Sequence, residues 1–309
     1  MRQIIFDSVV KGDRMNYNRL TTFINYLEFL KAKRGVFFQE FKKSEEFKGL
    51  MHPGKVKTVF QPILSLSKGD TIGFEILNRP QSTPSFPTTE KFYDYVGQSD
   101  NVFMLERFLR NLSLERYAEQ LRHANGYNNQ LVFLNIQPQV LADPAYRSGK
   151  TLELLAKYNL SPNQIVLELT EKEAVIDYNQ FEKIIDNYRQ QGFRIAVDDA
   201  GTGYNSLKTL VYLKPEFIKI DKSLIRNINE NPAKQYLVEL LLEFAVQSKT
   251  DVIAEGIETL TELSYLQNLG VQLGQGYALG KPTPTLNKGY LPLTKSPIAS
   301  RIPQLYKAK

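Results

Sequence analysis

The chain of 309 residues contains no cysteine and only two histidines, His52 and His123. The absence of cysteine excludes disulfide bonds, thiolate nucleophiles and thiolate-held zinc. Two histidines also leave almost no scope for a histidine-based metal cage or catalytic triad. Any chemistry of this protein must therefore depend on carboxylates, amides and lysine.

Long hydrophobic runs are missing as well. No segment approaches the roughly eighteen uncharged apolar residues that a membrane-spanning helix needs, and the first residues lack the apolar region of a signal peptide. The sequence therefore predicts a cytoplasmic protein. With 42% hydrophobic residues, the chain has the composition of a globular protein with a sizeable core.

The positive charge is confined to the two ends of the chain. The formal net charge is +6, but residues 1–55 hold eleven Lys and Arg against six acids, and residues 294–309 hold four bases and no acid. The 238 residues between these ends carry 24 bases and 27 acids. This acidic middle offers no basic groove for a polymeric nucleic acid. The basic ends are compatible with a membrane surface, with RNA or, more simply, with a solvated surface.

Short apolar runs of strand length alternate with longer amphipathic stretches from about residue 56. The expected strands are Val56–Leu66, Thr71–Leu77, Leu131–Ile136, Ile165–Leu169, Arg194–Asp198, Phe217–Ile220, Asp251–Ala254 and Gly274–Leu279. The expected helices include Val102–His123, Asn179–Gln191, Pro232–Ser248 and Thr259–Leu269. This pattern fits a TIM-type (βα)8 barrel of the α/β class better than an open doubly wound sheet.

The barrel is expected to be modified at its first strand. Only Ser67-Lys68-Gly69-Asp70 separates the first two runs, a spacing typical of a hairpin, so the first strand should be antiparallel to the second. We predict three segments: an N-terminal helical extension at 1–52, the barrel at 53–285, and a proline-containing basic tail at 286–309 that lies extended on the surface. The extension has a helical pattern from about Asn18 to Lys48 and suits a small cap or a partner surface.

Two adjacent carboxylates, Asp198 and Asp199, end an apolar run and precede the glycine-rich residues Ala200-Gly201-Thr202-Gly203. Like charges at the end of a buried run need a cation, a proton or exposure to water. One interpretation is an oxygen-rich site for a hard divalent metal. The alternative is a turn that only caps the next helix.

Charged and amide side chains also fall near the carboxyl ends of the other expected strands, where barrels of this type place their active sites. These residues are Glu75, Asn135, Glu168, Lys219, Asp221, Glu255 and Gln275. A single acid in one apolar run could be a structural ion-pair partner. Acids on several strands at one end indicate a site, because burying each would cost several kcal/mol unless it were paired or bound to metal.

The same residues stand in motifs that resemble, in order, the signature motifs of the EAL family of cyclic di-GMP phosphodiesterases. The motifs are Glu75-Ile76-Leu77-Asn78-Arg79, Asn135, Glu168-Leu169-Thr170-Glu171, Asp198-Asp199-Ala200-Gly201-Thr202-Gly203, Lys219-Ile220-Asp221, Ala254-Glu255-Gly256-Ile257-Glu258 and Gln275-Gly276-Tyr277. The resemblance covers about residues 56–285. It implies a barrel of the form predicted above and hydrolysis of cyclic di-GMP to linear pGpG.

The resemblance also implies a role for each matching position. Two Mg²⁺ or Mn²⁺ ions would be held by Glu75, Asn135, Glu168, Asp198, Asp199 and Glu255. The catalytic residues would be Glu255, Lys219 and Glu75. Substrate would be contacted by Gln61, Arg79, Asp221 and Gln275. Glu171 would anchor the loop Ala200–Ser206.

Two departures from the family pattern bear on activity. Ile76 replaces the alanine of the family name and should point into packing, because it alternates with Glu75 along a strand. Ala200 replaces a common phenylalanine and could loosen the following loop. The expected partners are cyclic di-GMP, a second copy in a homodimer, and a regulatory partner of residues 1–52. The rival interpretation is an EAL-type cyclic di-GMP receptor or protein-binding module with little or no turnover.

Overall fold

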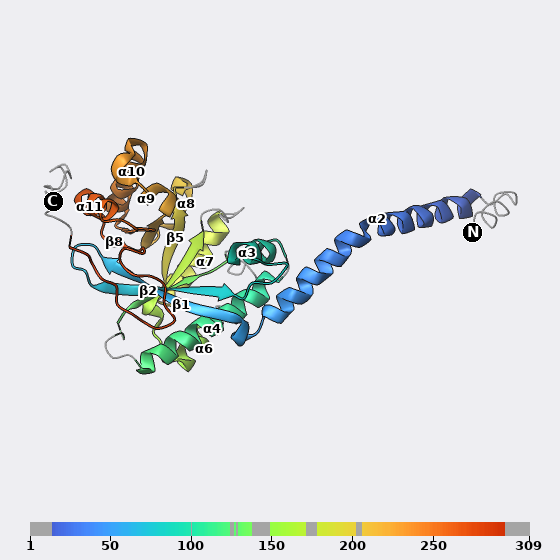
Figure 1. Ribbon diagram of the computed structural model, residues 1–309, viewed down its shortest axis with the longest axis horizontal. Coiled ribbons are helices and arrows are strands. Elements are labelled where there is room, and N and C mark those ends of the chain that lie inside the picture. The colour runs from blue at the N-terminus through green and yellow to red at the C-terminus, as the bar shows by residue number, and fades with distance from the viewer. Residues whose placement is uncertain are drawn as a thin grey trace.

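A computed structural model describes residues 14–99, 101–123, 127, 129–137, 149–170, 178–201 and 206–293. Eight strands of the described residues close into one barrel in chain order, and Figure 1 shows the barrel from one side. The strands are β1 (Val56–Ser65), β2 (Thr71–Pro80), β3 (Leu131–Asn135), β4 (Ile165–Thr170), β5 (Arg194–Ala200), β6 (Phe217–Ile220), β7 (Asp251–Ala254) and β8 (Leu273–Gly274).

The first strand has the opposite direction to its neighbours. β1 pairs antiparallel with both β2 and β8, and each of the other neighbouring pairs is parallel. The turn between β1 and β2 contains Gly69 at φ +78°, a conformation that glycine adopts without strain. The prediction of a modified TIM-type barrel with an antiparallel first strand is confirmed.

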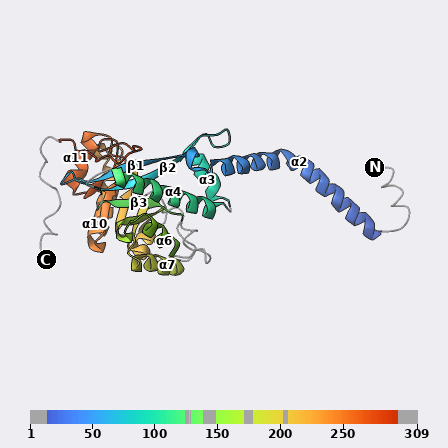
Figure 2. The same ribbon diagram turned by 90° about the horizontal axis from the view of Figure 1, so that it is seen from below.

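Helices cover the outside of the barrel between successive strands, which Figure 2 shows from below. They are α3 (Thr89–Gly97), α4 (Val102–His123), α6 (Gly149–Lys157), α7 (Tyr178–Gln190), α8 (Ser206–Leu213), α9 (Lys222–Ile225), α10 (Pro232–Ser248) and α11 (Leu260–Leu269). The predicted helices at Val102–His123 and Pro232–Ser248 have the predicted bounds. Helices α3, α6, α8 and α9 were not predicted, and all are short.

The predicted eighth strand was wrong in its position. The strand ends at Gly274, and the chain turns from Gln275 onward instead of continuing to Leu279. Gly276 lies against the backbone of Ile257, where an added Cβ would be 2.1 Å from the Ile257 carbonyl oxygen. A contact between segments far apart in the sequence therefore ends this strand.

The barrel interior contains one apolar layer. Its buried residues come from seven strands and are Ile63, Phe133, Val166, Ala196, Phe217, Ile253 and Leu273. The rings of Phe133 and Phe217 meet edge to face with centroids 5.3 Å apart. This layer closes the barrel centre and sets the position of the side chains that follow it on each strand.

A long helix, α2 (Arg14–Leu50), precedes the barrel and extends away from it in Figure 1. Its last turn carries Phe47 and Leu50, which are buried in a cluster with α3 and α4. The predicted helix over Asn18–Lys48 is confirmed. The domain boundary at residue 52 stays a prediction, and residues 1–13 lie outside the described part of the chain.

The segment after β8 folds back along the barrel. Thr283 and Phe60 exchange backbone hydrogen bonds, the backbone N–H of Gly289 donates to Thr71 Oγ1, and Leu286 is buried. Residues 286–293 form no helix or strand, and residues 294–309 lie outside the description, so the predicted extended tail over 286–309 stays a prediction. Among the helices that the structure describes, none has the length and apolar content required to cross a bilayer.

Candidate active site

Each strand carries, or is directly followed by, one polar residue two positions beyond the level of the apolar layer, which in β2 is the level of Gly73, the register partner of Ile63. Side chains alternate along a strand, so these residues face the same interior as that layer but lie at one end of the barrel. In β1 the polar residue precedes the layer because the strand is antiparallel. The eight residues are Gln61, Glu75, Asn135, Glu168, Asp198, Lys219, Glu255 and Gln275.

Lys219 lies at the centre of this polar ring. Its Nζ is 2.7 Å from Glu168 Oε1 and 2.7 Å from Glu255 Oε1, with Asp198 Oδ1 at 3.4 Å and Glu75 Oε1 at 3.6 Å. The Lys219 side chain is only 1% exposed. Burial alone would lower its pKa, but the surrounding carboxylates outweigh burial and hold the pKa well above its ordinary value. The ammonium therefore stays charged at neutral pH.

Glu75 is fixed by two amides. Gln275 Nε2 donates to Glu75 Oε2 at 2.7 Å, and Asn135 Nδ2 donates to Glu75 Oε1 at 3.2 Å. Both Glu75 and Gln275 are buried. These contacts explain why β3 ends in an amide, Asn135, and why another amide, Gln275, follows β8, since each holds the Glu75 carboxylate in one orientation.

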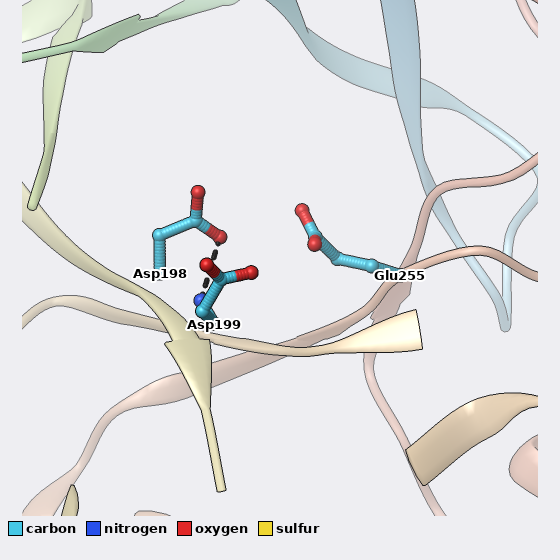
Figure 3. Close-up of side chains that lie close together, drawn as sticks. All are labelled: Asp198, Asp199 and Glu255. Carbon is cyan, nitrogen blue, oxygen red and sulfur yellow. Dashed lines mark hydrogen bonds between the residues drawn. The ribbon is translucent and has the colours of Figure 1, made fainter. Parts of the chain in front are cut away.

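A second group of acids lies beside Lys219. Oxygen atoms of Asp198, Asp199 and Glu255 lie within 4.8 Å of one another, and Figure 3 shows Asp198 and Glu255 facing each other across the site. The Asp199 N–H donates to Asp198 Oδ1 at 2.9 Å, and Asp199 has φ +55°, a left-handed conformation that aspartate tolerates. A donor set made only of oxygen atoms fits Mg²⁺ or Mn²⁺. The assignment of Glu75, Asn135 and Glu168 as further ligands stays a prediction.

Two of these acids resist ionisation. Burial raises the pKa of Glu255 to about 8, with Lys219 opposing the shift and Asp198 adding to it. Burial also raises the pKa of Glu168 well above its ordinary value. Perturbed carboxylates grouped in one place are typical of a functional site, because a bound cation would make their ionised form favourable.

The metal-free protein is expected to lose stability as the pH rises from about 5 to about 8. Glu255 binds its proton more tightly in the folded state than in the unfolded chain, so folding takes up a proton in this range. The free energy of unfolding should therefore fall over this range, by an amount on the order of a few kcal/mol. Denaturant titrations in EDTA at several pH values measure this slope.

Added Mg²⁺ or Mn²⁺ should stabilise the protein more at pH 8 than at pH 5, because the ligands must release protons to bind a cation. The variant Glu255→Gln, which lacks the titrating carboxyl, should show a flatter pH slope in EDTA. A free energy of unfolding that rises with pH from 5 to 8 in EDTA would contradict the assigned pKa shift.

The other predicted site residues have different surroundings. Gln61 is buried in β1 and donates to the Gly280 carbonyl oxygen at 3.2 Å, whereas Arg79 is exposed at the end of β2. Asp221 caps α9 and accepts a hydrogen bond from the Ser223 N–H at 2.9 Å. Glu171 lies outside the described residues. The substrate roles of Gln61, Arg79, Asp221 and Gln275 stay predictions.

A cavity of about 470 Å³ adjoins the acids. It lies between the ends of β2 and β3 and the helices α3 and α4, and its lining includes Glu75, Asn135, Arg79, Tyr93 and Gln137. Tyr93 was not predicted as a site residue, because helix α3, which carries it, was not predicted. Thr88, whose side chain accepts from the Lys91 N–H at 3.2 Å, is the capping signal that could have revealed that helix.

Glu262 positions the segment that carries Glu255. Its buried carboxylate accepts backbone hydrogen bonds from Asn227 at 2.9 Å, Glu258 at 2.9 Å and Thr259 at 3.0 Å. These bonds connect the turn after α9 to the loop after β7. Glu262 was not predicted, although Thr259, three residues earlier, forms with it a capping box that is readable in the sequence.

The two departures from the expected motifs are both buried. Ile76 is 3% exposed and packs in the main core, so the prediction that it points away from the site is confirmed. Ala200 is fully buried at the end of β5, with Ile220 as its register partner. Residues 202–205 lie outside the described part of the chain, so the expected effect of Ala200 on the loop stays a prediction.

The comparisons with known proteins agree on one family. A family model described as "EAL domain" matches residues 44–282. The chain is 33% identical over 230 residues to the probable cyclic di-GMP phosphodiesterase PdeB of Escherichia coli (strain K12), covering 73% of this chain and 42% of that protein. The chain spans between 27% and 42% of the length of the first curated relatives it matches.

Solved structures show the same barrel. A standalone versatile EAL protein from Vibrio cholerae O395, in its c-di-GMP bound form, is similar with a TM-score of 0.65 and 27% identity, covering 76% of this chain and 95% of that one. BlrP1 of Klebsiella pneumoniae, in a manganese and cy-diGMP complex at pH 6, has a TM-score of 0.68 and 25% identity, covering 78% of this chain and 59% of that one.

Proposed function

The chain belongs to the EAL domain family, and from this premise we propose that it hydrolyses cyclic di-GMP to linear pGpG in a metal-dependent reaction. The observation that carries the proposal is the ring around Lys219, in which four carboxylates lie within 3.6 Å of one ammonium. None of the acids that the family motifs require is missing from the sequence. Loss of Glu75, Asp198 or Lys219 would have favoured a receptor without turnover, and all three are present.

Divalent metal is part of the proposal. Asp198, Asp199 and Glu255 offer only oxygen ligands, and these oxygens lie close enough together to bind one hard cation. The similar structure of BlrP1 was solved as a manganese complex. Two Mg²⁺ or Mn²⁺ ions held at this end of the barrel would supply a nucleophilic water and neutralise charge on the phosphoryl oxygens. Histidine is not required for such a reaction.

The protein's own residues would complete the chemistry. Lys219 holds a permanent positive charge where negative charge develops on the phosphoryl group, a contribution of roughly 3 kcal/mol in a water-shielded site. Glu75, fixed by Gln275 and Asn135, keeps a carboxylate oriented toward that position. Arg79 beside the cavity would bind a phosphate oxygen through its fork of donors.

Several further parts of the proposal concern the whole protein. A homodimer, a regulatory partner of residues 1–52 and a cytoplasmic location are each proposed. Glu171 is proposed as the anchor of the loop Ala200–Ser206. The rival function, a weak or inactive cyclic di-GMP receptor, is favoured only by Ala200, which replaces a larger residue at the base of that loop.

The purified chain with Mg²⁺ or Mn²⁺ is expected to convert cyclic di-GMP to pGpG, and excess EDTA should abolish the conversion. Chromatography of the nucleotides measures it, with binding of cyclic di-GMP followed in parallel by calorimetry. If cyclic di-GMP binds but no pGpG forms with either metal, the enzyme function is rejected and the receptor function is favoured. If the chain neither binds nor hydrolyses cyclic di-GMP, both functions are rejected.

A further inference from the structure

Helix α2 carries an apolar stripe that the barrel does not cover. Figures 1 and 2 show most of this helix standing clear of the rest of the chain. Between residues 21 and 46 the structure leaves large side chains in solvent, including Phe23 at 55%, Phe37 at 51%, Phe38 at 55% and Phe41 at 60% exposure. Exposed aromatic side chains in this number indicate a surface that another molecule covers.

The stripe has the spacing of a coiled coil. Six positions are separated alternately by four and three residues, which is the a and d pattern of a heptad repeat. These positions, here called the seam, are Phe23, Leu27, Leu30, Arg34, Phe37 and Phe41. Five of the six are apolar. Ile24, Tyr26 and Phe38 lie beside the seam and widen it.

The helix docks on its own domain through a different face. Phe47 and Leu50 are buried against α3 and α4. At 3.6 residues per turn they lie roughly 120° and 180° around the helix from Phe41. The seam can therefore be covered by a second molecule without displacing any contact between α2 and the barrel.

We propose that a second copy of this chain covers the seam, so that two α2 helices form a parallel two-stranded coiled coil over residues 23–41. The eight apolar side chains of the seam and its flanks would each lose on the order of 100 Å², or about 800 Å² per copy. That area is what a stable protein interface buries on each side. No partner other than the chain itself is needed.

The charges beside the seam favour the parallel arrangement. In a parallel pair, Lys31 of one helix lies beside Tyr26 of the other, and Lys33 lies beside Phe38, so both lysines contact aromatic rings. In an antiparallel pair centred on the seam, Lys31 would face Lys31 of the other copy and Lys33 would face Lys33. These like charges would repel each other. Arg34 at one a position weakens the pair slightly and fixes its register.

A membrane surface fits the helix less well than a second copy. An interfacial helix binds anionic lipid through a polar face rich in bases. The side of α2 away from the seam mixes Glu28 and Glu46 with Lys42 and Lys43, so it offers little net positive charge to a bilayer.

Because the chain has no cysteine, single cysteines test the arrangement directly. In the full chain, the variant Leu30→Cys should form a disulfide-linked dimer in most molecules after mild oxidation. The matched control Gln39→Cys, exposed on the opposite side of the helix, should give at least tenfold less dimer. Cross-linking of Gln39→Cys as efficient as that of Leu30→Cys would overturn the proposal.

Mass measurements provide a second test that does not involve oxidation. The double variant Phe37→Glu and Phe41→Glu should sediment as a monomer at about 20 μM, while Phe29→Glu, off the seam, should remain a dimer. A dimer that survives the double substitution would overturn the proposal and place the contact elsewhere. A monomeric wild-type chain that binds vesicles of phosphatidylcholine and phosphatidylglycerol would also overturn it. None of these outcomes depends on turnover, so the proposed function is tested separately.

Discussion

Replacing Glu75 by alanine is expected to lower pGpG formation by roughly a thousandfold or more. Glu75 joins three other site residues, because its two oxygens accept from Gln275 and Asn135 and lie next to Lys219. The substitution removes a carboxylate from the proposed metal site and frees two amides to move. Turnover should therefore fail even where the barrel remains folded.

The matched control is Glu239→Ala, which removes an exposed glutamate from α10. It should leave turnover and thermal stability within the error of the wild type. Turnover is measured as pGpG produced at saturating Mn²⁺, with circular dichroism to verify folding. If Glu75→Ala keeps more than a tenth of wild-type turnover, Glu75 is not a metal ligand in the reaction.

Much of the barrel could be predicted because its signals are local. The apolar runs from Val56 onward alternate with amphipathic stretches, and the short Ser67–Asp70 connection indicates a hairpin. The eighth strand could not be placed, because Gly276 meets the backbone of Ile257, nineteen positions earlier, and that contact has no local signal. Short helices such as α3 were missed because a few residues carry little periodicity.

The acids of the site could be predicted because they interrupt apolar runs. Glu168 between Leu167 and Leu169 is costly in any buried strand, so its presence indicates a partner. The sequence could not show which acid lies nearest to Lys219, since the distances depend on strand register around the closed barrel. The cavity beside the acids and the bonds to Glu262 involve residues far apart in the chain, and they required the structure.

Replacing Lys219 by methionine is expected to destabilise the metal-free protein by about 3–5 kcal/mol. The side chains are similar in length, but four carboxylates would lose the ammonium that lies within 3.6 Å of each. Turnover should fall by roughly a hundredfold to a thousandfold, because the positive charge proposed to face the phosphoryl group is also lost. The control Lys183→Met removes an exposed lysine from α7 and should change neither property.

Divalent metal separates the structural role of Lys219 from its catalytic role. Mg²⁺ or Mn²⁺ near Asp198 and Glu255 would neutralise part of the repulsion, so Lys219→Met should gain more thermal stability from added metal than the wild type does. A stabilised variant that still turns over slowly would show that the ammonium acts during the reaction itself. Recovery of full turnover together with stability would instead assign Lys219 to folding alone, because the metal would then supply everything that the lysine contributes to the chemistry.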